Sequence, residues 1–336
     1  MQVLHCDNLL GEAPMYNSEE NALYWLDING KKLWRFHPES GDSKSWDLPE
    51  VAGSFAFAKG GGFLMGFTSG LSFFNPETGA VQKICDFEVL LSSNQPSFFF
   101  FNFDFMSVLV SVFLCLHSSH ANVYMQDGLN TRANDGKCDA DGNWVIGGYN
   151  NNHRNDKLNI TGLWRLNAKD MSLEEILDYR FRCSNTIAFS PDGGAMYFCD
   201  TPTREIVKFA YNPSGKLGEK THVWSMAEED KGGPDGATVD SQGGLWEAHA
   251  GNWKVVRHNP DDGRVDYQVK LPFNNPTSCA IGGANLDTLY ITTARHRLSE
   301  EERAQQPGAG QLWAVKLPTG IKGVPEQSFA APSPLQ

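Results

Sequence analysis

The feature that most constrains the fold of this chain is a strand, turn, strand pattern that recurs along it. Its first clear copy joins Leu23–Asp27 to Lys32–Phe36 through an Asn29-Gly30 turn, and two β-prone runs separated by such a turn indicate a hairpin. Further copies begin at Gly62, Asn143, Met196, Leu245 and Leu289. Apart from one interruption, the six units follow one another at about 40 to 50 residues, a spacing typical of four-stranded propeller blades.

This repeat predicts an all-β fold, a six-bladed β-propeller with four-stranded blades around a central channel, and one domain over residues 1–336. A large β-sandwich is the alternative, but a sandwich does not require the same order of strands and turns in every unit. The 33 glycines and 17 prolines interrupt the chain too often for long helices.

Charge and cysteine content narrow the functional classes. A net charge of -12 argues against a nucleic-acid partner, which would need clustered Lys and Arg. The seven cysteines are scattered, with no Cys-x-x-Cys spacing, so they indicate neither a disulfide framework nor a thiolate metal site. The N-terminus has no basic and apolar run typical of a secretion signal. We therefore expect a reduced, cytoplasmic setting.

An apolar stretch at residues 89–121 interrupts the repeat. Its most apolar part, residues 98–116, approaches the length of a membrane span, although Asn102 and Asp104 would be costly inside a bilayer. Three interpretations remain: a membrane anchor, an apolar flap, or sequence foreign to the fold, such as a translated intron. We favour the last, because the stretch lies between two copies of the repeat and resembles neither. We expect no membrane association unless residues 98–116 are present and inserted.

Aligned on the apolar residue before each turn, the units share one position four residues earlier. In a propeller, equivalent positions of successive blades lie on one ring about the central axis. The six residues at this position are Glu12, Gly53, Asn134, Asn185, Asp235 and Thr277.

Four of these six carry a carboxylate or amide oxygen. Oxygen donors with two formal negative charges suit a hard divalent cation, whereas each residue alone could simply cap a turn. Four such residues at the same repeat position favour a metal site. Ca²⁺, Mg²⁺, Mn²⁺ and Zn²⁺ all remain possible, because the sequence does not specify the metal.

Four short motifs resemble those of the SMP-30/gluconolactonase/LRE-like family, and together they run through most of the chain outside the insertion. They are Gly11–Pro14, Arg132–Lys137, Ser184-Asn185 followed by Ala188–Gly193, and Pro234–Gly236. The resemblance implies a six-bladed propeller with one divalent metal in its channel and, in many members, hydrolysis of sugar lactones.

By this resemblance, Glu12, Asn185 and Asp235 would be the metal ligands. Arg132 and Asn134 would contact the substrate, and Asp235 could also act as general base for the attacking water. Asp135 is a further substrate-binding candidate that could equally anchor the turn before Gly136. One departure from the family pattern is Thr186, where the family usually has a glycine, which adopts positive φ without steric cost.

The function predicted from the resemblance is divalent-metal-dependent hydrolysis of a sugar lactone. The alternative is a non-catalytic, calcium-binding regulatory propeller of the regucalcin type. A protein-binding scaffold would need an apolar face, which the sequence does not show. Strictosidine-synthase-like or paraoxonase-like enzymes account less well for the Arg132–Gly136 run. The sequence has no Gly-x-Ser-x-Gly elbow that would support a serine hydrolase, and His153, His249 and His296 are loop candidates for lining a pocket.

Overall fold

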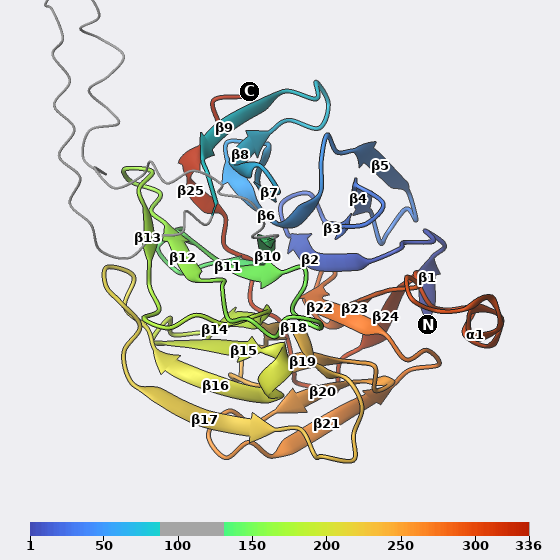
Figure 1. Ribbon diagram of the computed structural model, residues 1–336. Coiled ribbons are helices and arrows are strands. Elements are labelled where there is room, and N and C mark those ends of the chain that lie inside the picture. Colours follow the sequence, from blue (N-terminus) through green and yellow to red (C-terminus); the bar gives the residue numbers. More distant parts are fainter. Residues whose placement is uncertain (88–130, 336) are drawn as a thin grey trace, which may run out of the picture.

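The computed structural model describes residues 1–87 and 131–335, which form six sheets around a common centre (Figure 1). Within each blade the four strands pair antiparallel. This arrangement confirms the six-bladed β-propeller. The prediction that residues 89–121 are foreign to the fold lies outside the described residues. The described part contains no helix long and apolar enough to cross a membrane.

Each of the first three blades is built in chain order from the centre outwards. Their strands are, in blade 1, β2 (Gly11–Asn17), β3 (Ala22–Asp27), β4 (Lys32–Phe36) and β5 (Ser43–Asp47); in blade 2, β6 (Ala52–Lys59), β7 (Phe63–Phe67), β8 (Gly70–Phe74) and β9 (Val81–Cys85); and in blade 3, β10 (Thr131–Cys138), β11 (Trp144–Asn150), β12 (Leu163–Leu166) and β13 (Leu173–Glu175).

Blades 4 and 5 repeat this order, and blade 6 takes its outer strand from the start of the chain. Their strands are, in blade 4, β14 (Ser184–Phe189), β15 (Ala195–Asp200), β16 (Glu205–Ala210) and β17 (Lys220–Ser225); in blade 5, β18 (Gly233–Val239), β19 (Leu245–Ala250), β20 (Lys254–His258) and β21 (Val265–Lys270); and in blade 6, β22 (Pro276–Gly282), β23 (Thr288–Thr293), β24 (Leu312–Lys316) and β1 (Gln2–Leu4).

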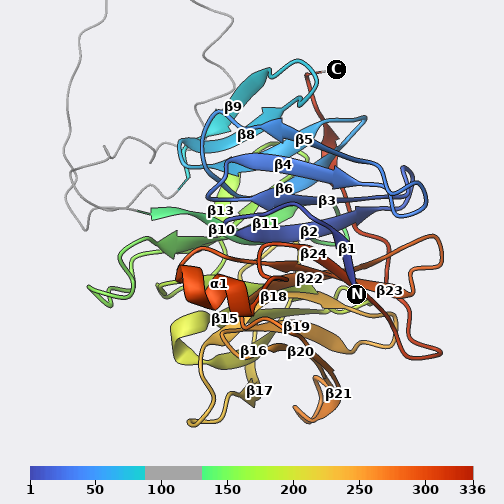
Figure 2. The same ribbon diagram turned by 90° about the vertical axis from the view of Figure 1, so that its right-hand side faces the viewer.

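The pairing of β1 with β24 closes the ring, because it joins the N-terminal strand to the last blade. The short helix α1 (Glu300–Gln305) precedes β24 and lies at the edge of the propeller in Figure 1. Figure 2 shows the same helix from the side, separated from the N-terminus. Another short element, the 3₁₀ turn η1 (Thr201–Thr203), follows β15.

The core lies between neighbouring blades rather than at the axis. One cluster joins Leu26 of blade 1 to Phe55 and Met65 of blade 2, and the next joins Leu64 of blade 2 to Trp144 of blade 3. Each sheet therefore packs both faces against its neighbours. This explains why many central strands read as almost continuous apolar runs, such as Ala22–Asp27, in which every residue is buried.

The C-terminal tail lies across one end of the channel. Its strand β25 (Phe329–Pro332) pairs in parallel with β6 at Ala58 and Lys59, and Lys137 of β10 forms an ion pair with Glu326 at 2.9 Å. These contacts involve the ends of β6 and β10 remote from the predicted ring of polar residues. The polar ring therefore faces the opposite end of the channel.

Candidate functional site

All six innermost strands contain an irregularity at the same place. The pairing register shifts at Glu12/Met15, Ala52/Ser54, Ala133/Gly136, Asn185/Ala188, Pro234/Ala237 and Pro276/Ser278. These shifts coincide with the six positions identified from the sequence repeat. Bulges redirect side chains and are common beside functional sites, so each blade presents its residue of the ring at a local break in regular pairing.

Five of the six ring residues line one pocket of about 610 Å³: Glu12, Asn134, Asn185, Asp235 and Thr277. Gly53 does not. A Cβ atom at Gly53 would lie 1.8 Å from the carbonyl oxygen of Ala133, far inside any allowed contact. Glycine is therefore required at this position by the close approach of β6 to β10.

Glu12 and Asp235 bring two carboxylates into the pocket without a cationic side chain paired to either in residues 1–87 and 131–335. Burial, followed by the charge of Asp135, raises the pKa of Glu12 to about 8. Burial also raises the pKa of Asp235 well above its usual value, with Glu12 as the next cause. The raised pKa values of Glu12 and Asp235 show that nearby described residues supply too little positive charge to balance these two buried carboxylates.

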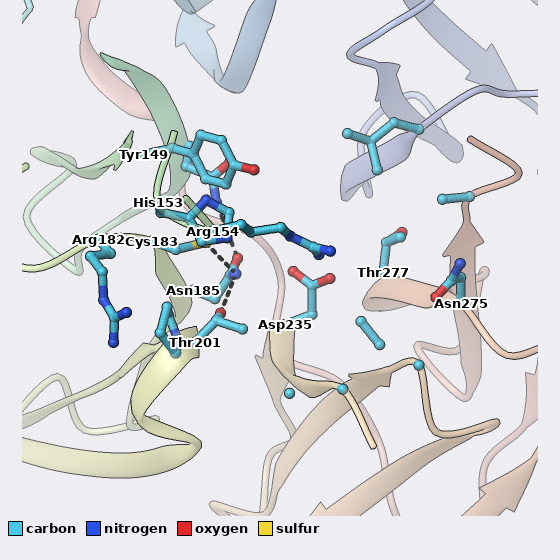
Figure 3. Close-up of a pocket in the computed structure, with 18 of the residues that line it drawn as sticks. Tyr149, His153, Arg154, Arg182, Cys183, Asn185, Thr201, Asp235, Asn275 and Thr277 are labelled. Carbon is cyan, nitrogen blue, oxygen red and sulfur yellow. Dashed lines mark hydrogen bonds between the residues drawn. The ribbon is translucent and has the colours of Figure 1, made fainter. Parts of the chain in front are cut away.

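A chain of hydrogen bonds connects blades 3, 4 and 5 along the pocket wall. The Arg132 guanidinium donates to Asn134 Oδ1 at 2.7 Å, and Asn134 Nδ2 donates to Asn185 Oδ1 at 3.3 Å. Asn185 Nδ2 in turn donates to Thr201 Oγ1, and Thr201 Oγ1 donates to the carbonyl oxygen of Pro234. Figure 3 shows the hydrogen bond between Asn185 and Thr201, with Asp235 nearer the middle of the view. These hydrogen bonds hold the Asn185 side chain through both its amide oxygen and its amide nitrogen.

Arg132 is held in a defined orientation beside this chain. It also donates to the carbonyl oxygen of Ala133 at 2.8 Å, and its guanidinium carbon lies 4.2 Å from the centre of the Tyr149 ring. Both of these hydrogen bonds use Nη1. Within the described part of the chain, the other guanidinium N–H groups are therefore available to a bound molecule.

Asp135 occupies a different environment from its neighbour Asn134. Its two oxygens accept the backbone N–H groups of Gly136, at 2.9 Å, and of Ile187, at 2.8 Å, and it is not among the residues that line the pocket. Burial raises its pKa to about 6. Of the two roles considered from the sequence, this geometry shows anchoring of blade 3 to blade 4. A role in substrate binding stays a prediction.

Thr186, which departs from the family pattern, has φ of 59°. This left-handed conformation is costly for a β-branched residue. The Thr186 hydroxyl donates to the carbonyl oxygen of Asp235 at 2.9 Å, a contact that glycine could not make. The local geometry associated with glycine is thus retained, and a hydrogen bond to a pocket residue is added.

A buried cluster behind Asp235 was not recognised from the sequence. Glu247 Oε1 accepts the backbone N–H of Asp235 at 3.0 Å, and Glu247 Oε2 lies 2.6 Å from His249 Nε2. The ligand atoms of Glu247, His249 and His258 all lie within 4.8 Å of one another, so this group could also hold a metal ion. The repeat gave no signal for it because Glu247 and His249 belong to β19 and not to an innermost strand.

The three histidine candidates lie in different environments in the structure. His153 and His296 line the pocket as predicted. His249 does not: it belongs to β19 rather than a loop and is fully buried. The six cysteines in the described part of the chain are all free.

Comparison with known proteins identifies relatives along nearly the whole chain. A family profile described as SMP-30/Gluconolactonase/LRE-like region matches residues 10–97 and 109–295. An L-arabinolactonase of Azospirillum brasilense is 33% identical over 310 residues, which cover 92% of this chain and 89% of that one. A 6-deoxy-6-sulfogluconolactonase of Pseudomonas putida is 29% identical over 98% of this chain and 97% of its own.

A solved structure supports the fold independently. The calcium-binding protein regucalcin of Agrobacterium tumefaciens superposes with a TM-score of 0.79 at 21% identity, covering 98% of this chain and 96% of that one. At this identity the similarity concerns the fold alone.

Proposed function

Since the chain belongs to the SMP-30/gluconolactonase/LRE-like family, we propose that it hydrolyses a sugar lactone with the help of one divalent cation. The observation that carries this proposal is that a pocket of about 610 Å³ contains two carboxylates, those of Glu12 and Asp235. Neither has an ion-pair partner among the described residues. A pocket of this size suits a monosaccharide. Sugar lactonases among the relatives support the substrate class.

The residues present fit a divalent cation. Glu12 and Asp235 would each supply a carboxylate oxygen and Asn185 an amide oxygen, the donor set preferred by Ca²⁺, Mg²⁺ and Mn²⁺. When bound, the cation would polarise the ester carbonyl and stabilise the negative charge that develops on its oxygen. The hydrogen bonds from Asn134 and to Thr201 would hold Asn185 in place for this role.

Asp235 is the proposed general base. With one carboxylate oxygen free, it would accept a proton from the water that attacks the lactone carbonyl. Arg132 would donate its free guanidinium N–H groups to oxygens of the substrate. Asn134, whose amide is already engaged with Arg132 and Asn185, would mainly orient these two side chains. Such positioning of reacting groups lowers the barrier to reaction.

The test is to measure opening of glucono-1,5-lactone and L-arabinono-1,4-lactone by proton release, with the spontaneous rate subtracted. We expect activity to disappear with a strong chelator and to return with excess Ca²⁺, Mg²⁺, Mn²⁺ or Zn²⁺. Asp235→Asn should lower kcat by about 100-fold or more, the usual range for loss of a general base. The matched control, Asp261→Asn, changes an acid with an 87% exposed side chain and should leave the rate unchanged.

Full activity of Asp235→Asn, or of the protein in chelator, would reject the mechanism. Tight binding of Ca²⁺ without turnover of any lactone would instead support a non-catalytic calcium-binding propeller.

A further inference from the structure

The pocket lining has a charge opposite to that of the whole chain. The protein has 40 acidic and 28 basic residues. Among the residues that the structure describes, only two acidic ones, Glu12 and Asp235, line the pocket, and a bound divalent cation would neutralise both. The same pocket is lined by six cationic side chains: Arg132, Arg154, Lys157, Arg182, Arg204 and Arg297. Such a concentration of one sign in a concave site attracts ligands of the other sign.

Most of these cations lack an acidic partner. In the described part of the chain, none of Arg154, Lys157, Arg182 and Arg297 forms an ion pair with a carboxylate. Within residues 1–87 and 131–335, the Arg204 guanidinium donates to the backbone oxygens of Ala227 and Asp230 and to no carboxylate. Outside the pocket, by contrast, the buried Arg165 is paired with Glu174 and Arg257 with Asp240. A structural role in ion pairs therefore does not explain the pocket cations.

Arg132 lies on the innermost strand β10, but four of the other cations lie on loops outside the innermost strands. Arg154 and Lys157 belong to the loop between β11 and β12, Arg182 lies two residues before β14, and Arg297 follows β23. Figure 3 shows Arg154 extending into the pocket from the side of Tyr149 and His153. Three separate loops thus bring positive charge to the pocket, while the innermost strands supply the acidic and amide groups.

A neutral sugar would leave this charge uncompensated. Its hydroxyl groups could bond to the ring residues and to Arg132, but it would offer the loop cations no anion. Arginine makes its strongest contacts with carboxylate, phosphate and similar oxyanions, through charge-assisted and often paired hydrogen bonds.

We propose that the substrate is a lactone bearing an anionic substituent, a phosphate, sulfonate or carboxylate, which the loop cations Arg154, Lys157, Arg182 and Arg297 bind while the ester group faces Asp235. This inference rests on the proposed lactonase function and specifies the substrate class of that same pocket. In this arrangement the loops recognise the anionic substituent of the substrate, and the innermost strands carry the residues that hydrolyse the lactone ester.

The experiment compares three lactones of similar size with the metal-loaded, full-length protein: neutral glucono-1,5-lactone, 6-phosphoglucono-1,5-lactone, and the carboxylate-bearing 1,4-lactone of glucaric acid. At low ionic strength, at least one anionic lactone should have a kcat/KM about tenfold or more above the neutral one. This ratio should fall as salt is raised, because salt screens charges that are accessible to solvent. The two anionic substrates distinguish a phosphate-like from a carboxylate preference.

Variants locate the effect in the pocket. The double variant Arg154→Gln with Arg297→Gln should reduce kcat/KM for the preferred anionic lactone about tenfold more than for the neutral one. The matched control is Arg264→Gln, because Arg264 has a 67% exposed side chain, pairs with Asp266 and lies outside the pocket. This control should leave the ratio unchanged. An equal ratio in the wild type and the double variant would overturn the proposal.

Binding of the open-chain acids separates this inference from the proposed function. The dissociation constants of gluconate and 6-phosphogluconate can be measured by calorimetry even if no lactone is turned over. Tighter binding of 6-phosphogluconate, lost in the double variant, would support an anion site whether or not the protein is a lactonase. Equal binding of the two acids, together with turnover of neutral lactones only, would overturn the anion site and leave the lactonase function intact.

Discussion

The hydroxyl of Thr186 donates a hydrogen bond to the carbonyl oxygen of Asp235 at 2.9 Å, so the strained residue of blade 4 is tied directly to a pocket residue of blade 5. This contact predicts different effects for three substitutions. Thr186→Ser should behave like the wild type. Thr186→Val should lower the free energy of unfolding by about 1 to 2 kcal/mol, because it loses a buried hydrogen bond and retains the strain.

Thr186→Gly should be close to neutral in stability, because relief of the left-handed strain offsets the lost hydrogen bond. The lactonase rate of Thr186→Gly should nevertheless fall, because the carbonyl oxygen of Asp235 no longer accepts the hydrogen bond that positions this residue. Urea unfolding and initial rates of all three variants check these expectations. A valine variant with wild-type stability and rate would show that the hydrogen bond is unimportant.

Asp235 also donates a hydrogen bond from its backbone N–H to the carboxylate of Glu247. Burial raises the pKa of Glu247, but the adjacent His249 and His258 outweigh this effect and keep the pKa below its usual value. Glu247→Gln should therefore lower the free energy of unfolding by about 3 kcal/mol, the upper end of the range for a hydrogen bond to a charged group. Glu77→Gln, which breaks the exposed pair with Lys44, should leave the midpoint of the same urea titration almost unchanged, because surface ion pairs contribute little to stability.

His296 predicts a pH dependence of stability. Burial and then the charge of Arg297 lower its pKa to about 4 from a usual value of 6.5. The unfolded chain therefore binds more protons at this residue between pH 6.5 and 4. The stabilising effect of the neutral ring is complete above pH 6.5 and is lost as the pH falls towards 4.

His296→Gln should accordingly lose less stability than the wild type between pH 7 and pH 4.5, as measured by urea midpoints. The matched control, His5→Gln, changes a histidine with a 71% exposed side chain and should follow the wild-type curve. Parallel curves for the wild type and His296→Gln would contradict the prediction.

Any side chain at Gly53, the ring position without one, should clash with the neighbouring strand β10. Gly53→Ala would place a Cβ atom 1.8 Å from the Ala133 carbonyl oxygen, which can be relieved only by moving β6 away from β10. We expect a loss of about 3 kcal/mol or more in the free energy of unfolding, and a lower lactonase rate because Asn134 follows Ala133. Gly215→Ala is the control, since its added methyl group would meet nothing within 4 Å. Equal stability of the two variants would show that the blades can separate without cost.

The repeat was enough to predict the propeller and the ring of polar residues. Strand spacing is local information, and every innermost strand carries its ring residue at the same phase of the pattern. Five of the six positions do line one pocket, and the sixth is glycine for a steric reason. Closure of the ring by β1 was not predicted, because three residues at the N-terminus carry too little pattern to be recognised as the outer strand of the last blade.

The sequence by itself therefore determined the architecture and the residues that converge on the axis. The tertiary structure decided where neighbouring side chains point. Asn134 and Asp135 are adjacent, and both lie in the irregularity of β10 between Ala133 and Gly136. There one side chain lines the pocket, while the other accepts the backbone N–H of Ile187 in the next blade. Only the closed ring brings Arg154, Arg182 and Arg297 to a single pocket, because these loop residues share no repeat position and meet only through the packing of different blades.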